Sequence, residues 1–236
     1  MKRFYKTVST APEEDGYSIQ LDGKPVRTPA RKILMAPTQR LADHIAVEWE
    51  AQVDVINPET MPLTQILTTA MDCAEADRAA IADEILGYLD TDLLCYRAEE
   101  PPAVYERQAQ TWDPWLMWFE HESGNKLHTT TGLAAIKQPQ GAHDFAAKIV
   151  RHADHFHFMA IQIVTAISGS LILGLAFVAG AATPDQVFES AQLEELYRNE
   201  IYNEDFYGKA PHQEKAHAGM LRDLNALRVF LDSLNA

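Results

Sequence analysis

The spacing of apolar residues changes along the chain, from alternation near the N-terminus to helical spacing further on. Tyr17, Ile19 and Leu21 alternate with polar residues, which predicts a half-buried strand. The Asp22-Gly23 pair that follows is typical of a β-hairpin turn. We therefore expect a small antiparallel β unit at the start of the chain.

From about residue 37 onward, apolar residues recur every three or four positions, which predicts helices. Asn57-Pro58 and Met61-Pro62 then interrupt the chain and indicate a boundary. The expected fold class is α+β, with a small β-rich N-terminal domain over residues 1–58 and a larger, mainly helical domain over residues 59–236.

Residues 158–182, FMAIQIVTAISGSLILGLAFVAGAA, contain no charged side chain. A membrane span needs roughly 20 mostly apolar residues, so this stretch is long enough to be one. Polar residues such as Gln162 dilute it, however, and no Lys/Arg cluster flanks it. The Gly169-Ser170 pair also predicts a break or a bend. We therefore expect two buried helices, or one bent helix, at the centre of a folded core.

A helix signal follows at Thr183, which is suited to an N-cap, with Pro184 at the first helical position and Gln186 at the capping-box position. If one helix continues from there, Glu194 lies at the border between a face of small residues and an apolar face. A carboxylate at such a border must find a partner, stay hydrated or shift its pKa. The simplest interpretation is a solvated helix edge on which Glu194 pairs with Arg198.

Acidic residues outnumber basic ones by 34 to 20, and the formal net charge is −14. This charge opposes non-specific binding to nucleic acid or to anionic lipid, and it suits a protein partner with an electropositive face. Cys73 and Cys95 lack the spacing of a metal or redox motif, so we expect buried thiols. The N-terminal residues MKRFYKTV resemble neither a signal peptide nor a transit peptide.

Three histidines, His152, His155 and His157, form an H-x-x-H-x-H cluster. On one helix only the first two share a face, and no Cys/His pair follows at a fixed spacing. We therefore expect surface or capping histidines and no metal site.

Three of the four tryptophans lie in WDPWLMW, residues 112–118. Such aromatic density marks an interaction surface in some proteins, but core packing is the interpretation that we favour. Asp113, directly before Pro114, is a candidate helix cap.

Common enzyme motifs are missing from the sequence: it has no GxSxG, P-loop, GxGxxG or HExxH segment. Asp90, Asp92, Glu99 and Glu100 are compatible with paired carboxylates for acid–base chemistry and equally with a solvated loop. We therefore assign no catalytic residue.

Seven segments occur in an order that is hard to attribute to chance. They are RFYK at residues 3–6, GYSIQLDGKPVRTPA at 16–30, EWEAQ at 48–52, MPLTQILTTAMD at 61–72, TDLLCYRA at 91–98, WDPWLMW at 112–118 and LEELYRNEIYNED at 193–205. Together they resemble the family of assembly chaperones for the alpha subunit of the F-type ATP synthase catalytic head.

The resemblance implies a β-rich domain followed by a helical one, no catalysis, no cofactor and transient binding to an unassembled alpha subunit. Family members depend on an acidic residue in the last conserved helix, and the matching position here is Glu194. The family's Trp-Gly pair is replaced by Tyr202 and Asn203. The residues expected to bind the partner are Glu194, Glu195, Tyr197, Glu200 and Tyr202.

We thus expect a monomeric chaperone without nucleic-acid binding or stable membrane insertion. We expect it in the cytoplasm of a bacterium, or in the mitochondrial matrix if the chain is a trimmed eukaryotic member. Two alternatives remain: a small-molecule hydrolase that uses acidic residues and histidines, and a membrane-associated protein that uses residues 158–182. Neither explains the ordered segments.

Overall fold

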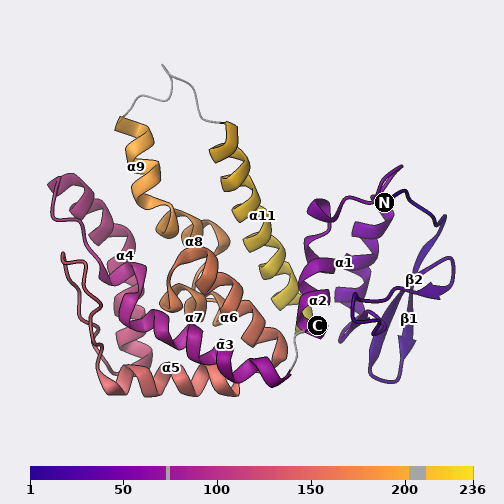
Figure 1. Ribbon diagram of the computed structural model, residues 1–236, viewed down its shortest axis with the longest axis horizontal. Coiled ribbons are helices and arrows are strands. Elements are labelled where there is room, and N and C mark those ends of the chain that lie inside the picture. The colour runs from indigo at the N-terminus through magenta and orange to yellow at the C-terminus, as the bar shows by residue number, and fades with distance from the viewer. Residues whose placement is uncertain (73–74, 202–210, 236) are drawn as a thin grey trace. The chain divides into compact units, whose positions relative to one another are not determined.

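The chain forms two compact units, of which the first holds a small sheet and the second is helical. The computed structural model describes residues 1–72, 75–201 and 211–235 (Figure 1). Unit 1 comprises Met1–Glu75 together with Arg222–Ala236, and unit 2 comprises Ala76–Leu221. A small antiparallel sheet followed by a mostly helical region confirms the expected α+β class.

Unit 1 is built on an antiparallel sheet in which β2 is the central strand. Its strands are β1 (Val8–Glu13), β2 (Gly16–Leu21), β3 (Lys24–Pro25) and β4 (Met35–Ala36). Strand β2 pairs with β1 along one edge and with β3 and β4 along the other. Asp22 and Gly23 both have positive φ, 50° and 74°, as a two-residue turn of this hand requires. The predicted hairpin is therefore confirmed.

Two helices, α1 (Gln39–Glu50) and α2 (Pro62–Asp72), also belong to unit 1. The Glu48 carboxylate on α1 accepts hydrogen bonds from the backbone N–H groups of Leu63 (2.7 Å) and Thr64 (2.8 Å), so it caps α2. These bonds tie α2 to α1, and both helices belong to the first compact unit, whose N-terminal segment runs to Glu75. The domain boundary at Pro58 stays a prediction from sequence.

Unit 2 is a helical assembly around one helix, α7, that is buried except at its last residue. Its helices are α3 (Glu75–Gly87), α4 (Pro102–Ser123), α5 (Gln140–His152), α6 (His155–Ser168), α7 (Leu171–Val178), α8 (Pro184–Ala191), α9 (Leu193–Ile201) and the first part of α11 (Pro211–Leu234). Every residue from Leu171 to Phe177 is buried. Helices α4, α6 and α8 pack around α7 (Figure 1).

The uncharged stretch forms most of two helices, the half-buried α6 and the almost wholly buried α7. Gly169, in the left-handed conformation with φ 71°, ends α6. The Ser170 hydroxyl then accepts a hydrogen bond from the backbone N–H of Leu173 and begins α7. None of the helices in the described residues is long and apolar enough to cross a membrane. The prediction of a buried, broken helix is confirmed.

The helix that begins after Thr183 is shorter than expected. Its capping box is present as predicted, with Thr183 and Gln186 each bonding the other's backbone N–H. The helix ends at Ala191, the backbone of its C-cap Gln192 leaves the helical region (φ −103°, ψ 9°), and α9 begins at Leu193. The expectation of one continuous helix is therefore wrong, and Glu194 lies in the first turn of a second helix.

Candidate functional site

The carboxylate of Glu194 is exposed, yet one of its oxygens is anchored to the interior. Its Oε1 accepts a hydrogen bond from Nε2 of Gln108 on α4 at 2.8 Å. Gln108 is fully buried, and its Oε1 in turn accepts from the backbone N–H of Ala98 at 2.8 Å. Glu194 is therefore hydrogen-bonded to Gln108. The pairing with Arg198 that the sequence suggested does not occur.

Glu200 is held by a two-point contact from the same neighbouring helix. The Arg107 guanidinium on α4 donates to both of its carboxylate oxygens, at 2.5 and 2.8 Å. Hydrogen bonding from Arg107 lowers the pKa of Glu200, and the same contact raises the pKa of Arg107. The guanidinium carbon also lies 6.0 Å from the ring centroid of Tyr197. Because the pair is exposed, it orients the side chains more than it stabilises the fold.

Glu195 faces a third element, the first part of α11. Its Oε1 lies 3.2 Å from Nε2 of His217, which is an ion-pair distance if the imidazole is protonated. The His217 ring also contacts the edge of Phe188 on α8, with centroids 5.3 Å apart. Glu194 and Glu195 both lie in the first turn of α9, where the helix dipole favours negative charge.

The structure thus brings four of the five predicted partner-binding residues onto one short helix. Tyr202, the fifth, lies outside the described residues. Sequence reasoning missed Gln108 and Arg107, which hydrogen-bond the carboxylates of Glu194 and Glu200, and His217, whose ring lies beside Glu195. Gln108 and Arg107 lie 86 and 93 positions from the carboxylates that they contact, and no local motif marks them.

The aromatic segment on α4 is a packing element, as predicted. The indole N–H groups of Trp112 and Trp115 donate to the backbone oxygen and the hydroxyl of Ser190, at 3.0 and 3.1 Å, and join α4 to α8. The suggestion that Asp113 caps a helix is wrong, because α4 continues through Pro114. Asp113 forms an ion pair with Arg97 at 2.6 Å instead.

The acidic residues near residue 90 do not form a catalytic pair. Asp92 is fully buried and accepts hydrogen bonds from the backbone N–H groups of Leu94 and Ile172, each at 3.1 Å. Burial raises the pKa of Asp92 to about 6 in spite of these bonds. Asp90 accepts instead from the backbone of Gln138 at 2.9 Å. Asp92 is thus a buried cap, neither a solvated loop residue nor half of a reactive dyad.

The histidine cluster has local structural roles. His157 pairs with Asp154 at 2.6 Å, and Nδ1 of His152 lies 2.8 Å from the backbone oxygen of Lys148. Among the residues that the structure describes, no three or more His, Cys, Asp or Glu side chains are placed to hold a metal ion.

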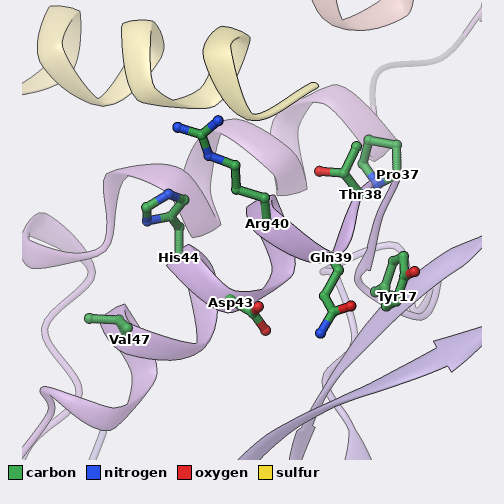
Figure 2. A pocket seen from close by; sticks show the side chains of 8 residues that line it. All are labelled: Tyr17, Pro37, Thr38, Gln39, Arg40, Asp43, His44 and Val47. Atoms are coloured by element: carbon green, nitrogen blue, oxygen red, sulfur yellow. The ribbon is translucent and has the colours of Figure 1, made fainter. Parts of the chain in front are cut away.

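A shallow pocket of about 740 Å³ lies on the outer face of α1 in unit 1. Figure 2 shows Arg40 and His44 projecting to one side of the helix and Gln39 and Asp43 to the other. Asp43 also accepts a hydrogen bond from the Thr10 hydroxyl at 3.1 Å. The side chains on this open surface do not form a nucleophile–base pair, so the pocket gives no support to the hydrolase alternative.

Comparisons with known proteins point to the same family as the sequence segments do. A family model described as "ATP12 chaperone protein" matches residues 2–120. The mitochondrial protein atp12 of Schizosaccharomyces pombe is 25% identical, over 88% of this chain and 79% of its own.

Two solved structures are similar over almost the whole chain. The crystal structure of Atp12 from Paracoccus denitrificans is 31% identical, with a TM-score of 0.88 over 99% of this chain and 98% of that one. A protein of Agrobacterium tumefaciens that is proposed to be a chaperone is 37% identical, with a TM-score of 0.89 over 99% of this chain and 86% of its own.

Proposed function

The chain belongs to the ATP12 chaperone family, whose members act in ATP synthase assembly, and from this premise we propose that it binds the unassembled alpha subunit. Chaperones are not enzymes, so membership of this family argues against the alternative that the chain is a hydrolase. The proposed partner is the alpha subunit before it meets its beta neighbours, and the proposed active form is a monomer. Because relatives come from mitochondria and from bacteria, we propose the mitochondrial matrix or the bacterial cytoplasm as the compartment.

The observation that carries the proposal is the arrangement of carboxylates on α9. Glu194 and Glu200 are held by α4, and Glu195 faces α11, so the acidic edge is oriented before any partner arrives. Only one oxygen of Glu194 is hydrogen-bonded to Gln108. Pre-oriented charges on a rigid helix reduce the entropy that binding costs, which suits a recognition surface.

The physical mechanism follows from what an unassembled subunit exposes. A subunit without its neighbours presents apolar surface, and such surface aggregates. The chaperone covers part of that surface reversibly, while the carboxylates of α9 speed the encounter and fix the orientation. Release follows when a beta subunit competes for the same face of alpha.

Two substitutions at Glu194 separate its charge from its hydrogen bond. Glu194→Gln removes the charge but keeps an oxygen that can accept from Gln108. Glu194→Lys reverses the charge and leaves the buried amide of Gln108 without its acceptor. We expect capture of an alpha subunit to fall modestly in the first variant and at least tenfold in the second, measured by pull-down with purified chaperone.

The control is Glu14→Lys, which makes the same change of charge at an exposed position in unit 1. It is expected to capture alpha normally. Wild-type capture by Glu194→Lys would show that α9 is not the binding edge, and failure of the wild-type chain to capture alpha would exclude the function itself.

A further inference from the structure

Arg198 is an exposed arginine on α9 that has no hydrogen-bonding or ionic partner within the part of the chain that the structure describes. The other arginines of unit 2 each donate to an oxygen of a carboxylate or of the backbone. They are Arg78, Arg97, Arg107 and Arg151. Arg198 is thus the exception among the arginines of this unit.

An acidic side chain stands where α9 itself could supply a partner for Arg198. Glu194 precedes Arg198 by four residues, and side chains at this spacing on an α-helix share a face and form ion pairs. The order of the two, with the acid nearer the N-terminus, is also the more favourable one. The ion pair is missing because the Oε1 atom of Glu194 accepts instead from the buried amide of Gln108 at 2.8 Å.

Glu194 and Glu200 are both held by α4, but only Glu194 keeps its charge unmatched. The amide of Gln108 is neutral, so it orients the Glu194 carboxylate without cancelling its negative charge. The Glu200 carboxylate, in contrast, is matched by the cationic guanidinium of Arg107. One face of α9 therefore presents an acid and a base that no other described residue neutralises. Local rules of this kind fail most often at functional sites.

We propose that Arg198 is a further partner-binding residue, which binds a carboxylate of the same unassembled alpha subunit whose cationic groups Glu194 attracts. This inference rests on the proposed function and deepens it, because it states that the bound surface of alpha carries an acidic side chain beside a basic one. A guanidinium binds a carboxylate through two parallel hydrogen bonds. A uniformly basic surface would attract Glu194 but repel Arg198, so the two residues together select against such partners.

Arg198→Gln tests the inference by the sign of its effect on capture. If α9 acted only through its negative charge, removal of a positive charge from this helix would strengthen the capture of alpha. The inference predicts the reverse, about fivefold weaker capture in the pull-down, because the carboxylate of alpha loses its partner. The thermal unfolding midpoint is expected to stay unchanged, since Arg198 bonds no other described residue. The control, Arg40→Gln, removes the same charge from an exposed position on α1 and is expected to capture alpha normally.

A second variant, Arg198→Lys, tests for the carboxylate of alpha directly. It keeps the positive charge and supplies a primary amine, which a carbodiimide reagent joins to a neighbouring carboxylate as an amide. Mass spectrometry of the captured and cross-linked complex is expected to find this amide between position 198 and an Asp or Glu side chain of alpha. The same reagent applied to an Arg40→Lys variant is expected to join position 40 to no residue of alpha.

The outcomes separate this inference from the function on which it rests. Unchanged or stronger capture by Arg198→Gln overturns the inference, as do equal losses in Arg198→Gln and Arg40→Gln. Cross-links from position 198 that reach only carboxylates of the chaperone itself overturn it as well. In each of these cases the function still stands on capture by the wild-type chain and its loss in Glu194→Lys. If the wild-type chain does not capture alpha, both are overturned.

Discussion

Replacing Asp92 with asparagine is expected to change how the stability of unit 2 depends on pH. The carboxyl group is fully buried between two helical starts, at Leu94 and at Ile172. Burial raises its pKa from 3.8 to about 6. Asparagine has a similar shape, cannot ionise, and offers one acceptor oxygen where aspartate offers two.

The size of the effect follows from the two pKa values. The folded chain holds the Asp92 proton more tightly than the unfolded chain, so stability from this group is fully present below about pH 4 and is lost as the pH rises through about 6. The difference between 3.8 and about 6 corresponds to roughly 3 kcal/mol. Asparagine removes this dependence and adds a loss of about 1–3 kcal/mol at every pH, because one N–H group is left unpaired.

The assay is urea unfolding of both proteins between about pH 4 and 8, followed by tryptophan fluorescence. Three of the four tryptophans lie in residues 112–118, so the signal reports mainly on unit 2. The advantage of the wild-type chain over Asp92→Asn is expected to shrink by roughly 3 kcal/mol as the pH rises across this range. Glu99→Gln, at an exposed carboxylate, serves as the control. An advantage that is constant or grows with pH would refute the reasoning, because it would mean that Asp92 stays ionised throughout.

Two further predictions concern carboxylates in other settings. Glu48→Ala removes the cap of α2 and is expected to lower the free energy of unfolding by about 2 kcal/mol, measured by thermal or urea unfolding. The control, Glu50→Ala in the same helical turn, is expected to change it very little. Equal losses in the two variants would contradict the capping role. Arg107→Ala is expected to raise the pKa of Glu200 towards its ordinary value, as followed by NMR titration, and to change the free energy of unfolding by less than about 1 kcal/mol. An unchanged pKa would show that the two-point contact is absent in solution.

Features that depend on neighbouring residues could be predicted from sequence. The hairpin at Asp22-Gly23, the capping box at Thr183 and the break at Gly169-Ser170 each arise from side chains within a few positions of one another. The burial of most residues between 158 and 177 agrees with the lack of charge in this stretch. These elements determine the α+β class.

Features that depend on distant partners could not be predicted. The compact units depend on contacts between segments far apart in the sequence, since Arg222–Ala236 belongs to the same unit as Met1–Glu75. The partner of Glu194 proved to be Gln108, a residue 86 positions away that carries no charge and belongs to no motif.

Several of the segments that carry the family resemblance contact one another in the fold. EWEAQ meets MPLTQILTTAMD through the contact of Glu48 with Thr64, and TDLLCYRA meets WDPWLMW through the ion pair of Arg97 with Asp113. The first contact lies within unit 1, and the second lies within unit 2, which also contains α9.

The central claim is that this chain keeps an unassembled alpha subunit soluble, and co-expression tests it most directly. An ATP synthase alpha subunit is expressed alone, with the wild-type chain and with the Glu194→Lys variant, and the soluble fraction of alpha is measured in each case. The account predicts that alpha is mostly soluble only with the wild-type chain. A soluble fraction that is the same in all three cultures would contradict it.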